Sequence, residues 1–255
     1  MSKSRMRHLT VAKKAYVTPR LIRITLTGED LREFPEKSES ANCKLVFEGA
    51  AESQTVRTYT IRGYRCDPRP EVDIDFFIHD EPGPASTWAK DAQTGSPIGL
   101  KGPSGPKLVN DTGDWVLLAG DMSAMPALEA NLERLSPETK GIAVFEVVSP
   151  EDKHAVKAPP GIDIQWVINP HPAMPNTVLV DAVRGLSLPG GTGGVWIAGE
   201  SHCARELRRY FRDEAGVPRS HLYTSGYWQM GLSEDSHQRL KRKEAAADTI
   251  GSEQS

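Results

Sequence analysis

The spacing of apolar residues changes between residues 105 and 115, and this change restricts the fold more than any other feature. Before it, short segments alternate apolar and polar residues, as Ile22, Ile24 and Leu26 illustrate. Alternation of this kind is typical of β-strands that bury one face. After it, continuous apolar runs such as residues 115–119 precede segments with helical spacing. Such runs are typical of parallel strands covered on both faces. The sequence therefore predicts two units with different architectures.

The first unit is predicted to be an antiparallel Greek-key β-barrel. Its expected strands are residues 9–11, 21–26, 44–47, 56–61 and 72–78, with one helix at residues 85–92. Turns rich in glycine, proline and aspartate separate the strands, which favours a closed barrel. The sequence Gly-Pro-Ser-Gly-Pro at residues 102–106 breaks the chain and indicates a domain boundary.

The second unit is predicted to be a Rossmann-like α/β domain. Its expected strands are residues 115–119, 142–148, 162–168, 195–198 and 220–228, and its expected helices are residues 124–135, 177–186 and 201–215. Strands and helices that alternate in this way form a parallel sheet covered on both faces. We therefore divide the chain into a barrel domain at 1–108, an α/β domain at 109–235 and a C-terminal helix or disordered tail at 236–255.

The composition argues against several classes of protein. The 255 residues carry a net charge of −3, which is unusual for a nucleic-acid-binding protein. No apolar run approaches the ~20 residues of a membrane span. The basic segment at residues 1–8 lacks the apolar core of a secretory signal. The three cysteines have no C-x-x-C spacing, which argues against a disulfide framework or a thiolate metal site. We expect a cytoplasmic protein that binds no structural metal.

A cation and an aromatic ring lie two residues apart on the strand expected at residues 56–61. Strand alternation places Arg57 and Tyr59 on one face and Thr58 and Thr60 on the other. A guanidinium binds phosphate and an aromatic ring packs against a planar heterocycle, so the pair is suited to a flat, anionic ligand. Thr60 offers a hydroxyl to the same ligand where the strand ends. The alternative is a surface cross-strand pair, which is common in sheets.

The start of the helix expected at residues 85–92 is suited to phosphate. It reads Gly83-Pro84-Ala85-Ser86-Thr87, so small side chains surround the free amides of the first turn. Such amides, together with the positive end of the helix dipole, bind anions. The alternative is a plain helix cap by Ser86 or Thr87.

The α/β unit contains two further candidate segments. Residues 120–124 read Gly-Asp-Met-Ser-Ala and form a strand-to-helix junction, although they do not match the G-x-G-x-x-G fingerprint. Glu200 ends a later strand, and the arginines at 205, 208, 209 and 212 follow it at helical spacing. They form either a binding face for a ribose phosphate or an ordinary solvated face. Cys203 lies at the start of this helix, where a reactive thiolate and a buried inert thiol are the two alternatives.

Seven short motifs follow one another along residues 8–232. They are Arg57-x-Tyr59-Thr60-x-Arg62, Asp75-Phe76-x-x-His79, Gly83-Pro84-Ala85-Ser86-x-Trp88-Ala89, Gly102-Pro103-x-Gly105, Gly120-Asp121-x-x-Ala124-x-Pro126-Ala127, Trp196-x-Ala198-Gly199-Glu200 and Gly226-Tyr227-Trp228-x-x-Gly231. Each motif is loose alone, but the ordered set is specific. It resembles the siderophore-interacting proteins, which are FAD-dependent ferric-siderophore reductases of the ferredoxin–NADP reductase superfamily.

The resemblance implies that the barrel binds FAD. Arg57 would hold the pyrophosphate, Tyr59 would pack on the flavin with Thr58 beside it, and Thr60 would lie near the reactive edge of the ring. The residues implied for the phosphates and the ribityl chain are His79, Gly83, Pro84, Ala85, Ser86 and Thr87. No catalytic residue is expected beyond the flavin itself.

The resemblance also implies that the α/β domain binds NADPH or NADH. The residues implied on this side are Asp121, Ser123 and Ala124 near the nicotinamide, and Glu200 and Arg205 on the pyridine nucleotide. The implied function is that of an NAD(P)H ferric-siderophore reductase that releases iron as Fe(II) in the cytoplasm. Ferredoxin is the alternative electron donor, and we expect a monomer.

An anionic ferric chelate requires a basic binding surface. The candidate bases are Lys44, Arg62 and Arg65, with Lys101 and Lys107 as further candidates. The chain departs from the family pattern at Asp80 in place of glycine, Met122 in place of glutamate and Gln229 in place of arginine. The alternative functions are a flavin reductase with another electron acceptor and a non-enzymatic module that binds a siderophore.

Overall fold

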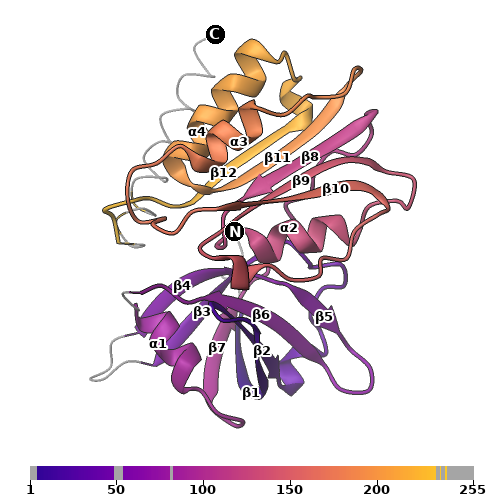
Figure 1. Ribbon diagram of the computed structural model, residues 1–255. Coiled ribbons are helices and arrows are strands. Elements are labelled where there is room, and N and C mark those ends of the chain that lie inside the picture. The colour runs from indigo at the N-terminus through magenta and orange to yellow at the C-terminus, as the bar shows by residue number, and fades with distance from the viewer. Residues whose placement is uncertain (1–4, 49–53, 81–82, 234–235, 237–238, 240–255) are drawn as a thin grey trace, which may run out of the picture.

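The computed structural model describes residues 5–48, 54–80, 83–233, 236 and 239. It contains an antiparallel sheet formed by the N-terminal part of the chain and a parallel sheet formed by the C-terminal part (Figure 1). The predicted fold class, a β-barrel followed by a Rossmann-like domain, is confirmed. Nearly all of the tail expected at residues 236–255 lies outside the described residues.

The antiparallel sheet has seven strands in the order β4-β3-β7-β1-β2-β6-β5. They are β1 (Met6–Thr18), β2 (Leu21–Thr27), β3 (Asn42–Glu48), β4 (Gln54–Thr60), β5 (Gly63–Arg65), β6 (Glu71–Phe77) and β7 (Pro97–Lys101). The alternation that predicted β2 is realised in the core, because Ile22, Ile24 and Leu26 are 0% exposed. Strands β5 and β7 were not predicted, since β5 has three residues and β7 contains proline and glycine.

The antiparallel sheet curls so that strands distant in the hydrogen-bonding order pack together through side chains. The ring centroids of Tyr59 on β4 and Phe76 on β6 are 4.5 Å apart. Helix α1 (Pro84–Asp91) covers this contact, with Trp88 packed against Phe76 at 5.8 Å and against Phe47 at 5.4 Å. These aromatic contacts close the barrel around its core.

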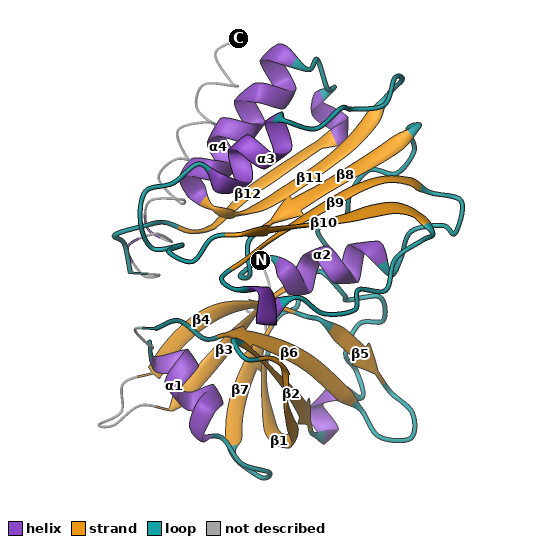
Figure 2. Ribbon diagram, in the orientation of Figure 1, coloured by secondary structure: helices purple, strands orange, loops and turns teal. Residues whose placement is uncertain are grey.

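The parallel sheet has five strands in the order β10-β9-β8-β11-β12. Its elements are β8 (Trp115–Gly120), α2 (Met125–Leu132), β9 (Lys140–Val147), β10 (Gly161–Ile168), α3 (Val178–Arg184), β11 (Gly193–Glu200), α4 (Ser201–Arg209) and β12 (Leu222–Trp228). Figure 2 shows α3 and α4 on one face of this sheet and α2 on the face toward the barrel. All eight residues of α2 are buried, because the helix is covered by the sheet on one side and the barrel on the other.

Buried polar contacts fix the two sheets against each other. Asn131 of α2 donates from Nδ2 to Ser40 Oγ at 2.9 Å and to the Lys107 carbonyl at 3.0 Å. The carboxylate of Asp152, which is 0% exposed, accepts a hydrogen bond from Thr18 Oγ1 at 2.9 Å. Because a buried polar group without a partner is costly, these contacts hold the domains in one orientation. The division of the chain after residue 108 stays a prediction. No helix in the described ranges is long and apolar enough to cross a membrane.

Candidate functional site

A cavity of about 630 Å³ lies between the antiparallel sheet and the parallel sheet. We call it the interdomain cavity. Its lining includes Lys44, Thr58, Tyr59, Thr60, Phe77, His79, Lys101, Lys107, Met122, Ser123 and Tyr227. Strands β3, β4 and β7 and the end of β6 provide the barrel side, and the β8–α2 junction and the end of β12 provide the other side. Its volume lies in the range of about 300–1,000 Å³ that is typical of cofactor sites.

The end of β4 meets the cavity through three successive residues. Thr58, Tyr59 and Thr60 all line it, although strand alternation predicts that neighbours point to opposite faces. Strand β4 is an edge strand, and the cavity extends from its end over β3 and β7 on its paired side. Arg57 is not among the described lining residues, and its NH1 group donates to the Val56 carbonyl at 2.9 Å.

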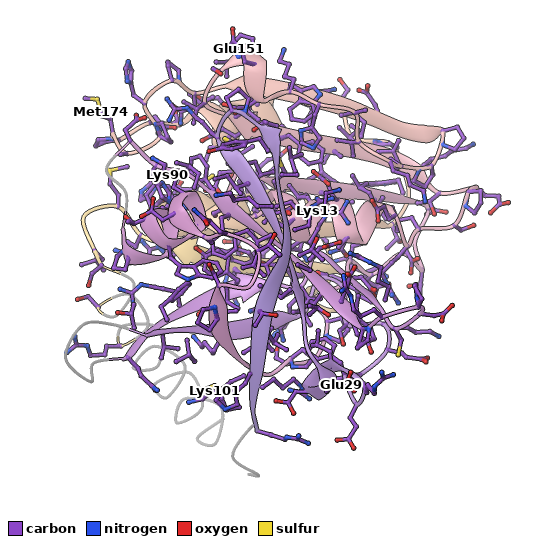
Figure 3. All side chains as sticks on the ribbon, turned by 90° about the horizontal axis from the view of Figure 1, so that it is seen from below. Lys13, Glu29, Lys90, Lys101, Glu151 and Met174 are labelled. Carbon is purple, nitrogen blue, oxygen red and sulfur yellow. The ribbon has the colours of Figure 1, made fainter. Side chains whose placement is uncertain are left out.

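Lysines form the basic part of the cavity wall. Lys44 on β3 and Lys101 on β7 are register partners on adjacent strands, and both line the cavity together with Lys107. Figure 3 labels Lys101 in a view from the barrel side of the molecule. Both ammonium groups contribute positive charge to the same part of the wall, which favours an anionic ligand there. The Lys44 ammonium also contacts the Thr58 hydroxyl.

The structure places the other two predicted bases elsewhere. Arg62 has a side chain only 10% exposed and forms ion pairs with Glu129 at 2.8 Å and Glu133 at 2.7 Å. Burial works to lower the pKa of Arg62, but these two carboxylates raise it overall, so the guanidinium stays charged. Arg65 is exposed and is paired with carboxylates on the barrel surface. Both arginines have carboxylate partners within the protein, and the substrate role expected for them stays a prediction.

His79 lines the cavity and is exposed as a whole residue, and its ring centroid lies 4.3 Å from that of Phe77. Desolvation by the surrounding protein lowers the pKa of the His79 imidazole, which favours the neutral ring at pH 7. The predicted phosphate segment begins four residues later at Gly83, the N-cap of α1. The alternative of a plain side-chain cap is not realised there, since Ser86 Oγ donates to the Phe77 carbonyl at 3.4 Å instead.

A second cavity, of about 650 Å³, lies at the carboxyl edge of the parallel sheet. We call it the sheet-edge cavity. Asp121 lines it and joins the ends of three strands, because its carboxylate accepts from Glu200 N at 2.8 Å and from Trp228 Nε1 at 2.8 Å. Ser123 also donates to this carboxylate, from N at 2.9 Å and from Oγ at 2.5 Å. Burial raises the pKa of Asp121, and these hydrogen bonds oppose the rise.

A second carboxyl group of the sheet-edge cavity was not predicted. Glu146 lies near the end of β9 and accepts a hydrogen bond from Asn169 Nδ2 at 2.9 Å. Burial and the nearby Asp121 carboxylate raise the pKa of Glu146 to about 7. An acidic residue inside an otherwise apolar strand run was the signal in the sequence that could have identified it.

Glu200 and Arg205 also line the sheet-edge cavity, as does Gln229. The Glu200 carboxylate caps α4, accepting from His202 N at 2.5 Å and from Cys203 N at 3.0 Å. Burial raises the pKa of the Cys203 thiol well above its usual value, so the thiolate alternative is not supported. Among the described residues, no group of three or more His, Cys, Asp and Glu side chains could hold a metal ion.

The two cavities lie next to each other, because at two places residues adjacent in the sequence line different cavities. Asp121 lines the sheet-edge cavity, whereas Met122 and Ser123 line the interdomain cavity. Likewise Tyr227 lines the interdomain cavity and Trp228 the sheet-edge cavity. Ala124 is buried between the walls. The β8–α2 junction and the end of β12 therefore form a thin partition between the two predicted cofactor regions.

Family models match nearly the whole chain. A siderophore-interacting FAD-binding domain matches residues 10–56 and 48–107, and a siderophore-interacting protein model matches residues 113–231. Both matches agree with the resemblance that the seven motifs carry.

Curated relatives are similar over the same length. The ferric vibriobactin reductase ViuB of Vibrio cholerae is 37% identical over 252 residues, which cover 91% of this chain and 92% of the relative. An NADPH-dependent ferric-chelate reductase of Escherichia coli is 31% identical over 244 residues, which cover 88% of this chain and 93% of the relative.

The fold is also similar to solved structures. The siderophore-interacting protein SipS from Aeromonas hydrophila has a TM-score of 0.84 at 27% identity, covering 95% of this chain and 99% of that one. A ferredoxin reductase from a carbazole dioxygenase system matches with a TM-score of 0.65 at 16% identity, which shows similarity of fold alone.

Proposed function

The chain belongs to the siderophore-interacting protein family, and from this membership we propose that it reduces the ferric iron of a siderophore and releases it as Fe(II). It is a flavin-dependent oxidoreductase whose cofactors are FAD and NADPH or NADH. The observation that carries the proposal is the interdomain cavity, which has an aromatic and hydroxyl wall on β4, a lysine wall on β3 and β7, and the nucleotide-type β8–α2 junction opposite. The proposed location is the cytoplasm.

The barrel side of the interdomain cavity fits a flavin. Tyr59 offers an aromatic face, and Thr58 and Thr60 offer hydroxyl groups along the same edge. The N-terminus of α1, which has no side-chain cap, offers amides to the phosphates, and Arg57 offers a cation. A bound FAD would supply the link between two-electron hydride chemistry and the single-electron reduction of ferric iron.

The sheet-edge cavity supports a role in binding the pyridine nucleotide. It lies outside the carboxyl ends of parallel strands, where ligands of open α/β sheets bind. Asp121 and Ser123 hold the β8–α2 junction in shape by their mutual hydrogen bonds, and Arg205 offers a cation on α4. Glu200 positions the start of α4 rather than offering a free carboxylate.

The lysine wall supports an anionic substrate. Siderophores hold Fe(III) through hard oxygen donors, and reduction weakens that match, so the iron is released without protein ligands. In this chain Lys44, Lys101 and Lys107 take the place that the sequence also offered to Arg62 and Arg65. Gln229, at the position of the expected arginine, faces the sheet-edge cavity, so it leaves this wall unchanged.

One experiment tests the proposal directly. The purified protein should be yellow, with flavin absorption near ~450 nm. Addition of NADPH or NADH and a ferric siderophore, with a ferrous-iron trap present, should then produce Fe(II). Rapid reduction of a small organic acceptor beside slow reduction of several ferric siderophores would favour the alternative of another acceptor. If the siderophore is reduced only when reduced ferredoxin is present, ferredoxin takes the place of the pyridine nucleotide as the electron donor.

Replacement of Lys44 and Lys101 by glutamine should raise KM for an anionic ferric chelate roughly tenfold, because two charges that attract the chelate are lost. Reduction of a neutral quinone should change little. The matched control is the double variant Lys13→Gln with Lys90→Gln, which removes two lysine charges from exposed residues outside the cavity lining (Figure 3). Equal KM values for the chelate in the two double variants would remove the lysines from the proposed wall.

Replacement of Arg57 by alanine should weaken FAD binding roughly tenfold or more, because a charge-assisted hydrogen bond to phosphate contributes about 1.5–3 kcal/mol. The measurement is the ratio of FAD to protein after gel filtration, followed by titration of the stripped protein with FAD. Arg69→Ala serves as the control, since Arg69 is exposed and pairs with Glu71 on the barrel surface. An unchanged FAD ratio in Arg57→Ala would argue against the role given to this residue.

A further inference from the structure

Tyr227 carries an unexplained hydroxyl group. The Tyr227 ring lines the interdomain cavity at the end of β12, but its hydroxyl oxygen is buried. Within the part of the chain that the structure describes, this hydroxyl makes no hydrogen bond. A buried hydroxyl without a partner costs about 1–3 kcal/mol, so its retention at the cavity wall requires an explanation.

The neighbour of this hydroxyl is Thr60, at the end of β4. Thr60 is 6% exposed and lines the same cavity from the barrel side. Tyr227 and Thr60 line the interdomain cavity from its two sides. Burial raises the pKa of Tyr227 well above its usual value, and the Thr60 side chain opposes this rise. The phenol therefore keeps its proton and can act as a donor.

The direction of a hydrogen bond between these two side chains follows from the number of protons and lone pairs that each hydroxyl group offers. A tyrosine hydroxyl has one proton to donate, and a threonine hydroxyl has one proton and two acceptor lone pairs. If Tyr227 donates to Thr60 Oγ1, the proton of Thr60 is left for another acceptor. Because Thr60 lines the interdomain cavity, an acceptor atom of a ligand bound there can take this proton.

We propose that Tyr227 is a positioning residue, which donates a hydrogen bond to Thr60 and so directs the Thr60 hydroxyl proton toward an acceptor atom at the reactive edge of the flavin. This inference rests on the proposed function, in which Thr60 lies beside that edge. It assigns to the end of β12, in the nucleotide-binding part of the chain, a part in setting the electronic properties of a cofactor held by the barrel.

The inference predicts a change in the flavin rather than in stability. A donor to an acceptor nitrogen of the ring stabilises the oxidised form more than the reduced form, in which that nitrogen carries hydrogen. Tyr227→Phe should therefore make the midpoint potential of bound FAD more positive and alter the fine structure of its absorption band. Thr60→Val should shift both in the same direction, whereas Thr60→Ser keeps the hydroxyl and should restore the wild-type values.

The control is Tyr223→Phe, which removes a phenol from the same strand at a residue that stacks on Trp196 and lies outside both cavity linings. It should leave the potential and the spectrum unchanged. The double variant Tyr227→Phe with Thr60→Val should shift the potential no further than Thr60→Val alone, because Tyr227 acts through Thr60. Thermal unfolding of every variant without FAD separates these effects from loss of structure.

Three outcomes would overturn the inference. The first is a Tyr227→Phe protein that binds FAD with wild-type spectrum and potential. The second is an additive double variant, which would show that the two residues act independently. The third is an equal shift in Tyr223→Phe, which would assign the effect to the strand as a whole. Failure of the wild-type protein to bind FAD would instead contradict the proposed function, so the two failures are distinguishable.

Discussion

Replacement of Gly199 by alanine is expected to lower the free energy of unfolding by about 3 kcal/mol or more, because two separate costs add. Gly199 has φ of +143°, a conformation that residues with a side chain rarely adopt. A Cβ atom at this position would also lie 2.6 Å from Oδ2 of Asp121. That oxygen accepts the hydrogen bonds from Glu200 N and Trp228 Nε1, so the methyl group would displace the contact that joins β8, β11 and β12.

The loss should appear in urea unfolding and in the affinity for the pyridine nucleotide, because the displaced carboxylate lines the sheet-edge cavity. Gly216→Ala separates the two costs. Gly216 also has positive φ, at +68°, but a Cβ atom there would meet nothing within 4 Å. This control should cost about 1 kcal/mol from backbone conformation alone and leave nucleotide affinity unchanged. Equal losses in the two variants would show that the contact with Asp121 contributes little.

The two architectures could be predicted because the spacing of apolar residues that distinguishes them is set by residues close together in the sequence. Period-two alternation at Ile22, Ile24 and Leu26 and the apolar run at β8 each depend on a few adjacent residues. Strand β7 was missed for the same reason, because Pro97 and Gly99 are residues that locally favour turns. Its strand conformation comes from pairing with β1 and β3, which are distant in the sequence.

The segments that line the two cavities could be predicted from the sequence, but not every side chain that lines them. The carboxyl ends of the parallel strands and the end of β4 do line the two cavities. The sequence does not reveal that Thr58, Tyr59 and Thr60 all reach one cavity, because β3, β7 and the β8–α2 junction, which help to enclose it, are distant in the chain. Whether a cation faces a cavity depends on the residues that reach it from elsewhere in the fold. Lys44 and Arg62 were equivalent in the sequence, yet only Lys44 lines the interdomain cavity.

Replacement of Arg62 by alanine is expected to destabilise the protein by about 3–5 kcal/mol, because it leaves a buried charge without its partner. Glu129, with a side chain 6% exposed, accepts hydrogen bonds from Arg62 at 3.1 and 2.8 Å. Its remaining partner is His154, whose Nε2 lies 2.7 Å from Glu129 Oε1. Arg62 follows β4 and Glu129 belongs to α2, so the same loss loosens the barrel from the parallel sheet. The interdomain cavity lies between them, and FAD affinity should fall as well.

Arg65→Ala is the matched control, since Arg65 ends the next strand, β5, three residues after Arg62, and both arginines were candidate substrate contacts. Arg65 is 44% exposed in its side chain and pairs with Glu71 and Asp73 at 2.5 and 2.7 Å within the barrel. Water replaces a lost partner at such a site, so the expected cost is about 1 kcal/mol or less, without loss of FAD. Urea unfolding and FAD titration of both variants give the comparison. If Arg62→Ala resembled Arg65→Ala in both measurements, the buried ion pair would not hold the domains together. If Arg62→Ala instead raised KM for the ferric chelate in a stable, FAD-bound protein, Arg62 would return as a substrate contact.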